Sequence, residues 1–586
     1  MVACANGHSD IVSCLLEAGV EPESCDALGW TARELAVFRG HLGIATLFTS
    51  TPSETTNGGP AGSHRLAYKN PRQTFFSNSS ERLVVVNLGS TQGGHDRAAF
   101  ELSHYIPERS SGPRSTSSLV LEICAPGTEA DAKLVRLPIL EDQINQPFIF
   151  QAKNEAPLQI SVRLFRRESM DSMVLLSRGN TTLDHGKVFF GKKRESMVRE
   201  VTVFMMDKET MDLTGTVLLS YVVATPFAGL QQPDTTNYQR RLGDPMRMVG
   251  HRGLGQNTDN RSYLQLGENT AMVRNNISFE YTWALTSNLQ ITRDLEAVIF
   301  HDFSLSESGT DVAIHDVTLS QYKHASDLQE PQSITPATID TSGVLHGYPQ
   351  RRRAWSTGEE SRLRTVQLRD RLRYTVDFQS KGFKPNTRGD FIQGSLATLD
   401  ELLMNLPEDI GFNIEMKYPR LHEAVDAGVA PVTIDINTFV DVALEKIQRL
   451  AGNRPIILSS FTPEVCILLS VKQKTYPVMF ITNAGKVPMA DKELRVASLQ
   501  VGVQFARFWN LAGVVFACEA LLYCPRLVQF VKNAGLVCAS YGLLNNEPIL
   551  ARKQADAGVD IIMVDRVKLV AEELAKDGTM SNTSLN

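Results

Sequence analysis

The chain has 586 residues, too many for one hydrophobic core, and this length predicts about three to four domains. A hydrophobic fraction of 42%, a charged fraction of 21% and a net charge of -6 give no reason to expect nucleic acid or a membrane surface as partner. The eight cysteines form no CxxC pair, so we interpret them as reduced thiols of a cytoplasmic protein without a disulfide or zinc framework. The most apolar run, 511–518, is too short for a transmembrane segment, and the amino terminus lacks a secretory signal pattern.

Residues 1–50 contain an internal repeat. Two Gly-His pairs, ending at His8 and His41, stand 33 residues apart, and apolar positions suited to a second helix follow each pair. This period is typical of ankyrin repeats, whose helix pairs bury their faces against neighbouring repeats. Fewer than two repeats are present, so we interpret the segment as a truncated ankyrin unit that offers a surface to a protein partner. A plain helical hairpin is the alternative.

Residues 51–80 are rich in Ser, Thr, Asn, Gly and Pro, and we interpret them as a linker. Residues 81–228 then consist of short β-type runs separated by turn residues. The run 158–164 alternates apolar with polar side chains, as a strand with one solvent-facing side does. Several such runs predict an antiparallel, C2-like β-sandwich without a catalytic cluster. A lipid or calcium role for this domain is the less favoured alternative.

Residues 245–575 alternate apolar β-type runs with helix-like stretches. Roughly eight strands, each followed by a helix, predict an α/β fold of the TIM-type (β/α)8 barrel class. A charged stretch at 351–373 interrupts the alternation and is interpreted as a solvent-exposed insertion. The expected strand runs after the first are 295–300, 411–416, 455–458, 477–481, 513–516, 536–540 and 561–564.

Polar segments stand at or near the ends of several expected strands, where the active sites of such barrels lie. Cations can hold a phosphate, carboxylates can hold a metal ion, and imidazoles can move protons, so this set suits phosphodiester cleavage. The alternative interpretation of the two histidines is a pair of packed core side chains. The segments are His251-Arg252-Gly253, Gly267-Glu268-Asn269-Thr270, His301-Asp302 and Glu415-Met416-Lys417-Tyr418-Pro419.

The order of these motifs closely resembles the glycerophosphodiester phosphodiesterase family over residues 247–570. The tail segments 539–546 and 558–566 extend the resemblance. With the ankyrin-like and β-type segments before it, the chain is similar to the fungal-type glycerophosphocholine phosphodiesterases, whose chains also begin with an SPX domain that residues 1–586 do not include. The resemblance implies hydrolysis of glycerophosphodiesters, with glycerophosphocholine as the expected substrate, to glycerol 3-phosphate and an alcohol.

The resemblance also implies a role for individual residues. His251 and His301 would act as general acid and base, and Arg252 and Lys417 would contact the substrate phosphate. A hydroxyl group of the glycerol would be the nucleophile through a cyclic phosphate, so no serine or cysteine of the enzyme is required.

The implied metal site departs from the family pattern. Glu415 would be one ligand of a divalent metal ion, Mg²⁺ or Ca²⁺, and Glu268 with Asn269 would support the first histidine. The Glu-x-Asp pair of the family falls here on Thr286 and Asn288. Neither carries a carboxylate, which a hard divalent cation prefers, so we expect impaired metal binding.

Residues 272–289 lack the alanine-rich helix and the β-strand that the family pattern places there. One hypothesis is a misread exon or retained intron, which a spliced transcript encoding the same stretch would rule out. The other is a genuine pseudoenzyme. Three functions therefore stay open: an active phosphodiesterase, an impaired barrel that binds ligand or serves phosphate signalling, and an interaction scaffold. The retained histidines favour the first, whereas Thr286 and Asn288 favour the second.

Overall fold

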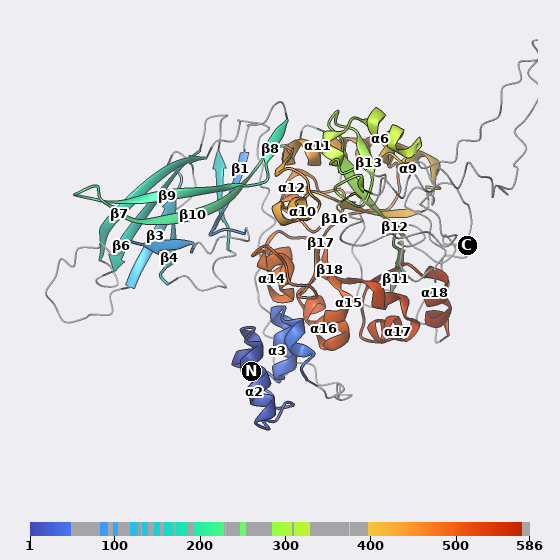
Figure 1. The fold of residues 1–586 in the computed structure, drawn as a ribbon, viewed down its shortest axis with the longest axis horizontal. Helices are drawn as coiled ribbons and strands as arrows, with labels where there is room; N and C mark the ends of the chain where they lie inside the picture. Colours follow the sequence, from blue (N-terminus) through green and yellow to red (C-terminus); the bar gives the residue numbers. More distant parts are fainter. Residues whose placement is uncertain are drawn as a thin grey trace, which may run out of the picture.

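The computed structural model consists of an N-terminal helical segment, an antiparallel β-sheet domain and a parallel barrel (Figure 1). The expected linker 51–80, the charged stretch 351–373, Glu268 and Asn269 lie outside the described residues. The structure describes residues 1–48, 82–91, 98–103, 118–126, 128, 132–138, 146–152, 158–167, 172–183, 193–227, 229, 246–252, 284–306, 310–327, 374–375, 396–408 and 410–576.

The helical segment packs against one side of the barrel. Helix α3 begins with a capping box, in which Thr31 and Glu34 satisfy each other's backbone N–H groups. Its Phe38 packs edge-to-face on Phe530 of the barrel, with ring centroids 5.0 Å apart. Two helix pairs suit a helical hairpin as well as ankyrin repeats, so the ankyrin interpretation stays a prediction. The helices are α1 (Val2–Ala5), α2 (Ser9–Glu17), α3 (Ala32–Arg39) and α4 (Leu42–Ala45).

The β-sheet domain has the strand order β4-β3-β6-β7-β9-β10-β1-β5, with β2 paired to β10, and these neighbouring strands run antiparallel. Side chains of β6 alternate between buried and more exposed positions, which gives the domain a core of its own. The predicted antiparallel β domain is confirmed. Its strands are β1 (Arg82–Leu88), β2 (Phe100–Leu102), β3 (Ser118–Cys124), β4 (Lys133–Arg136), β5 (Phe148–Ala152), β6 (Leu158–Arg167), β7 (Met173–Leu183), β9 (Glu200–Asp207) and β10 (Leu213–Ala224).

Eight parallel strands form the barrel, which closes because β11 pairs with both β12 and β20. Apolar side chains from these strands fill the interior, and a second, larger core lies between the strands and the surrounding helices. The predicted TIM-type barrel is confirmed. Its strands are β11 (Arg247–Gly250), β12 (Ala284–Ile291), β14 (Gly411–Met416), β16 (Ile456–Ser460), β17 (Val478–Thr482), β18 (Gly513–Ala517), β19 (Val537–Tyr541) and β20 (Ile561–Val564).

Helices surround the barrel, and within the described residues none is long and apolar enough to cross a membrane. They are α6 (Leu319–Asp327), α9 (Leu399–Asn405), α10 (Leu421–Asp426), α11 (Ile436–Leu450), α12 (Pro463–Lys472), α13 (Leu494–Ala497), α14 (Leu499–Phe508), α15 (Cys518–Tyr523), α16 (Arg526–Asn533), α17 (Pro548–Asp556) and α18 (Val567–Ala575).

Two expectations about strands are wrong. Residues 272–289 do not lack a strand, because β12 begins at Ala284, is buried throughout and pairs in parallel with β14. The run 295–300 is not a barrel strand, because β13 (Ala297–Ile299) pairs antiparallel with the end of β12. A turn stabilised by Thr292, whose hydroxyl accepts the N–H of Glu296 at 3.0 Å, reverses the chain between them. Residues 272–283 lie outside the described residues.

Arg454 stabilises the end of helix α9. It is 4% exposed, and its guanidinium donates to four backbone carbonyls in and after the last turn of α9. The guanidinium also lies 4.8 Å from the Phe412 ring centroid. We expect Arg454→Met to lower the free energy of unfolding of the barrel by about 2–4 kcal/mol in a urea titration. The exposed Arg449 offers a matched control. Arg449→Met should change the free energy of unfolding by less than about 0.5 kcal/mol. The four carbonyls belong to Leu403, Leu406, Pro407 and Ile410.

Candidate active site at the carboxyl end of the barrel

His251 directly follows strand β11 at the mouth of the barrel. Its backbone N–H donates to the carbonyl of Val564, the last residue of β20, at 2.8 Å. Its Nδ1 lies 2.7 Å from Oδ1 of Asp565, whose side chain is only 6% exposed. A carboxylate at Nδ1 fixes the orientation of the ring and leaves Nε2 for a substrate.

Asp565 is itself held in place by Asn546. The amide nitrogen of Asn546 donates to Asp565 Oδ2 at 2.7 Å, and its amide oxygen accepts the backbone N–H of Asp565 at 2.7 Å. Asn546 is 1% exposed and ends a short 3-10 helix, η4 (Leu543–Asn546), after strand β19. The two loops that follow β19 and β20 therefore act together to orient His251.

His301 reaches the same end of the barrel through the β12–β13 hairpin. Its Nδ1 lies 2.6 Å from Oδ1 of Asp302. The buried Gln290 of β12 donates its amide to the carbonyls of Phe300 and Asp302, both at 2.8 Å. Because these carbonyls flank His301 on both sides, Gln290 fixes the backbone that carries the imidazole. Both histidines thus have a carboxylate at Nδ1.

Burial lowers the pKa of His301 well below its usual value, and the positive charges of Arg252 and Lys417 lower it further. The hydrogen bond to Asp302 acts in the opposite direction. His301 is therefore neutral near pH 7, with its proton on Nδ1 facing Asp302 and an electron pair on Nε2. A neutral imidazole of this kind can accept a proton.

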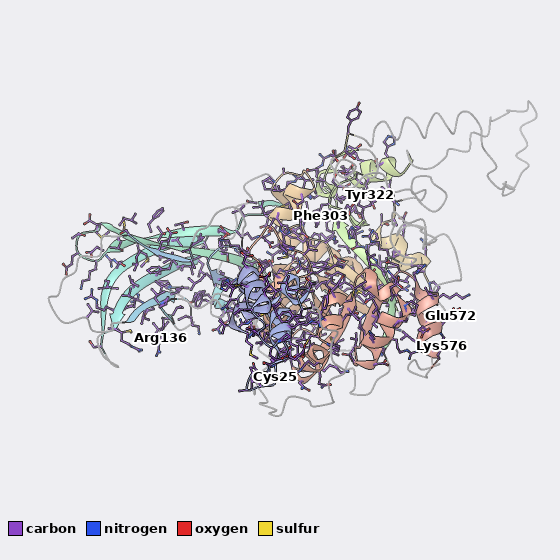
Figure 2. The ribbon with its side chains drawn as sticks, turned by 60° about the horizontal axis from the view of Figure 1, so that its bottom comes forward. Cys25, Arg136, Phe303, Tyr322, Glu572 and Lys576 are labelled. Atoms are coloured by element: carbon purple, nitrogen blue, oxygen red, sulfur yellow. The ribbon has the colours of Figure 1, made fainter. Side chains whose placement is uncertain are left out.

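The two cations expected to hold phosphate come from different strands. Arg252 follows His251, and its backbone N–H donates to the hydroxyl oxygen of Thr286 on β12 at 2.8 Å. Lys417 follows β14, and its Nζ lies 3.3 Å from Glu415 Oε1 and 5.3 Å from the ring centroid of Phe303. Phe303 is labelled in Figure 2. The charges of Arg252 and Lys417 both lower the pKa of His301, and Phe303 lies two residues after His301.

The described donors do not fit a divalent metal ion. Thr286 and Asn288 are 6% and 1% exposed on β12, and Asn288 is opposite Glu415 in the β12–β14 register. Glu415 is the single carboxylate among these three positions, and it already pairs with Lys417. Among the residues that the structure describes, no three His, Cys, Asp or Glu side chains lie together as metal ligands would. No step of the reaction is therefore assigned to a metal ion.

The structure brings together most of the residues expected from the sequence. These are His251, Arg252, Thr286, Asn288, His301, Glu415 and Lys417. Asp565, Asn546, Asp302 and Gln290 received no role from the sequence, although the first three lie within the motif segments 558–566, 539–546 and 301–302. Asp565 meets His251 from the loop after β20, and Gln290 of β12 holds the backbone around His301. A local pattern does not contain these contacts, whereas Asp302 is next to its partner His301 in the sequence.

Comparison with known proteins identifies relatives of both the barrel and the β-sheet domain. Residues 251–569, more than half of the chain, match the glycerophosphoryl diester phosphodiesterase family, and residues 78–228 match the GDE1-like C2 domain. The chain is 35% identical over 432 residues to glycerophosphocholine phosphodiesterase GDE1 of Eremothecium gossypii, which covers 70% of this chain and 32% of the relative. It is 32% identical over 538 residues to the GDE1 of Candida albicans, which covers 86% of this chain and 45% of that relative.

The chain spans less than half the length of these two relatives. A solved putative glycerophosphoryl diester phosphodiesterase from Agrobacterium tumefaciens is 18% identical, with a TM-score of 0.36, over 58% of this chain and 100% of that one. The match of residues 251–569 decides the assignment. The chain belongs to the glycerophosphoryl diester phosphodiesterase family.

Proposed function

We propose that the barrel hydrolyses glycerophosphocholine to glycerol 3-phosphate and choline, with His251 and His301 as the proton-transfer groups. One observation carries the proposal: two histidines, each with a carboxylate at Nδ1, stand at one mouth beside Arg252 and Lys417. The curated relatives are named glycerophosphocholine phosphodiesterases, which supports this substrate.

The two cations bind the substrate before any bond changes. The guanidinium of Arg252 and the ammonium of Lys417 attract the single negative charge of the phosphodiester to the mouth of the barrel. They also stabilise the additional charge that develops on the phosphoryl oxygens in the transition state. Lys417 can turn from Glu415 to the phosphate, because an ammonium on a flexible chain acts as a point charge.

In the first chemical step, neutral His301 accepts the proton of a glycerol hydroxyl, whose oxygen attacks phosphorus. The bond between phosphorus and the choline oxygen breaks, and His251 donates a proton to that leaving oxygen. A cyclic glycerol phosphate results. In the second step, water opens the ring with the two histidines in exchanged roles, which yields glycerol 3-phosphate and restores both protonation states.

Hydrolysis of glycerophosphocholine by the purified chain tests the proposal. Release of glycerol 3-phosphate should be measured with EDTA, with Mg²⁺ and with Ca²⁺. We expect turnover that rises little with either cation, because the described donors include one carboxylate. Absence of turnover in all three conditions, with glycerol 3-phosphate still bound in a calorimetric titration, would instead favour the catalytically impaired, ligand-binding barrel.

The lowered pKa of His301 predicts the pH profile. The base must be neutral, so activity falls as pH drops through its pKa, and a lowered pKa places the acid limb of kcat/KM well below pH 6.5. Removing a nearby positive charge by Lys417→Met should move that limb to higher pH, besides weakening substrate binding. A limb that stays in place would show that the proton acceptor is not His301.

We also propose a cytoplasmic location and a protein partner for the helices of residues 1–48. Free thiols support the first proposal: all eight cysteines are unpaired with one another. Exposed apolar side chains on α2 support the second, with Ile11 and Leu15 exposed by 52% and 42%.

A further inference from the structure

Residues 193–199 of the β-sheet domain, called the arm here, lie against the barrel (Figure 1). Strand β8 (Arg194–Ser196) pairs antiparallel with β15 (Val432–Ile434) of the barrel as a separate two-stranded sheet. The N–H of Met197 donates to the carbonyl of Pro431 at 3.0 Å, and the carbonyl of Lys193 accepts the N–H of Asp435 at 3.0 Å. The backbone of the arm is therefore held along its length.

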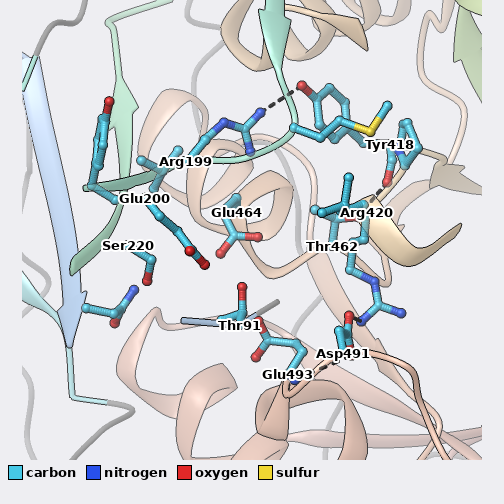
Figure 3. Close-up of a pocket in the computed structure, with 16 residues that line it drawn as sticks. Thr91, Arg199, Glu200, Ser220, Tyr418, Arg420, Thr462, Glu464, Asp491 and Glu493 are labelled. Atoms are coloured by element: carbon cyan, nitrogen blue, oxygen red, sulfur yellow. Dashed lines mark hydrogen bonds and ion pairs between the residues drawn. The ribbon is translucent and has the colours of Figure 1, made fainter. Parts of the chain in front are cut away.

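On one side the arm contacts the segment that carries Lys417. The next residue, Tyr418, is 2% exposed, and its hydroxyl accepts from Arg199 Nη2 at 2.8 Å (Figure 3). The same hydroxyl lies 2.8 Å from Glu195 Oε1. Arg199 and Glu195 form an ion pair with each other, and Glu195 also accepts the N–H of Ile436. Burial, followed by the charge of Glu195, raises the pKa of Tyr418, so its hydroxyl stays protonated.

On the other side the arm contacts the segment that follows His301. Arg194 donates to the carbonyl of His315 at 2.6 Å and pairs with the carboxylate of Asp316. Both acceptors belong to the 3-10 helix η3 (Ile314–Asp316), and the N–H of Ile314 donates to the carbonyl of Phe303 at 3.0 Å. Phe303 stands two residues after His301, so one further hydrogen bond connects the arm to the catalytic loop.

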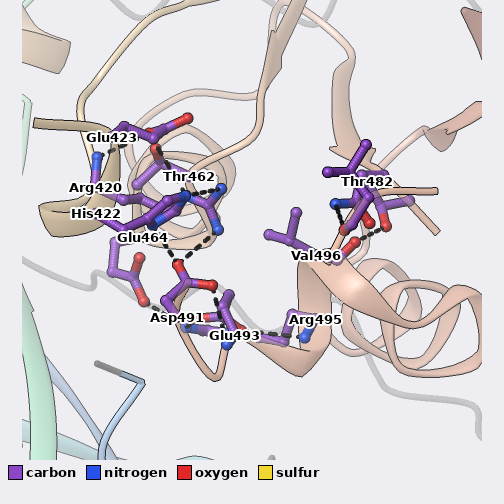
Figure 4. Close-up of polar contacts among 12 residues, drawn as sticks. Arg420, His422, Glu423, Thr462, Glu464, Thr482, Asp491, Glu493, Arg495 and Val496 are labelled. Carbon is purple, nitrogen blue, oxygen red and sulfur yellow. Dashed lines mark hydrogen bonds and ion pairs between the residues drawn. The ribbon is translucent and has the colours of Figure 1, made fainter. Parts of the chain in front are cut away.

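The barrel holds the Lys417 segment from the opposite side by its own contacts. Arg420 donates to Asp491 at 3.1 Å, and His422 pairs with the same carboxylate at 2.8 Å (Figure 4). A polar cavity of about 60 Å³, lined by Arg199, Tyr418 and Arg420 among others, lies between the two sets of contacts. The arm's contacts with the Tyr418 hydroxyl add to those of the barrel, in which the Tyr418 ring lies 5.1 Å from that of Phe439 and its hydroxyl lies 2.9 Å from the carbonyl oxygen of Ile434.

We propose that the arm is a brace for the active site, in which Glu195 and Arg199 position Lys417 and Arg194 positions the loop of His301. The inference rests on the proposed function for the reaction that it affects. The β-sheet domain then takes part in catalysis by fixing the distance between a phosphate-binding cation and the proton acceptor. A displacement of about 1 Å in such a site costs about 100-fold in rate.

The test compares Arg199→Met with Arg163→Met. Arg163 lies in the same domain, pairs with Glu122 at 2.6 Å and has a side chain exposed by 42%, away from the barrel contacts described above. We expect Arg199→Met to lower kcat by about 10- to 100-fold with a smaller change in KM, and Arg163→Met to change neither by more than about twofold. Tyr418→Phe, which removes only the hydroxyl, should reproduce part of the loss. The double variant Arg199→Met/Tyr418→Phe should lose less than the product of the single effects, because the two groups form one contact.

Hydrogen exchange separates this proposal from the proposed function. Amides of residues 411–419 should exchange faster in Arg199→Met, those of 301–306 faster in Arg194→Met, and neither segment should change in Arg163→Met. If the unaltered chain hydrolyses no glycerophosphocholine, the proposed function fails. Hydrogen exchange of the variants still shows whether the arm positions the two segments. Unchanged exchange in Arg199→Met and Tyr418→Phe would overturn the brace. Should Arg199→Met fail to fold, Tyr418→Phe decides through its kcat and through the hydrogen exchange of residues 411–419.

Discussion

Replacing His301 with alanine is expected to lower kcat for glycerophosphocholine hydrolysis by about 10²- to 10⁴-fold, the range that a positioned proton-transfer group contributes. The imidazole is neutral because burial and the charges of Arg252 and Lys417 lower its pKa. Asp302 and Gln290 hold its ring and backbone, so alanine removes the base from an otherwise fixed loop. Glycerol 3-phosphate release under saturating substrate measures the effect. KM should change less, because the two cations that hold phosphate remain.

His324 provides the matched control. It is exposed on helix α6 outside the site, so His324→Ala should keep kcat within about twofold of the unaltered chain. The acid limb of kcat/KM should also disappear in His301→Ala and persist in His324→Ala. A loss of less than tenfold in His301→Ala, with the acid limb in place, would assign the proton acceptor to another group.

The barrel could be predicted from the sequence because most of its strands are continuous apolar runs. Strand β14 has the predicted bounds, 411–416, and β20 has the predicted bounds, 561–564. Strand β12 was missed because Thr286, Asn288 and Gln290 give it a polar alternation unlike the other runs. These side chains approach the polar mouth of the barrel, where Thr286 accepts the N–H of Arg252 and Gln290 holds the His301 loop. Its pairing with β11 and β14 depends on residues that are distant in the sequence, so a local pattern does not reveal it.

The active site could also be predicted only where it does not depend on contacts between residues distant in the sequence. His251 and Lys417 follow strands, so topology alone places them at one mouth. The choice of Asp565 as partner of His251 joins positions 314 apart in sequence, and the contact of Arg199 with Tyr418 joins positions 219 apart. Both depend on side-chain geometry after the chain has closed. The β-sheet domain therefore looked non-catalytic in sequence, although its arm reaches the segment that carries Lys417.

The double variant Thr286→Glu/Asn288→Asp is expected to create a divalent metal site. Asn288 is opposite Glu415 in register, and Thr286 lies two residues earlier on the same side of β12, so three carboxylates would meet at the mouth. Without metal, these buried like charges repel and should lower stability. With millimolar Ca²⁺ or Mg²⁺ the variant should gain about 2–4 kcal/mol of stability, seen as a rise in Tm. Turnover should become metal-dependent and rise by about 100-fold over the unaltered chain, since a bound metal contributes several kcal/mol to transition-state charge stabilisation.

The variant Thr286→Gln/Asn288→Asp separates the effect of side-chain charge from that of side-chain size at position 286. Gln keeps the length of Glu and an oxygen that can accept the N–H of Arg252, but it supplies no anionic ligand. Its Tm should therefore respond less to Ca²⁺ than that of the Glu/Asp variant, with EDTA as the common reference. If neither variant shows a cation-dependent Tm, the carboxylates on β12 do not converge with Glu415. If both Tm values respond to the cation but turnover does not rise, Thr286 and Asn288 account for the weak metal site of the unaltered chain. The activity of this chain is then limited elsewhere in the barrel mouth.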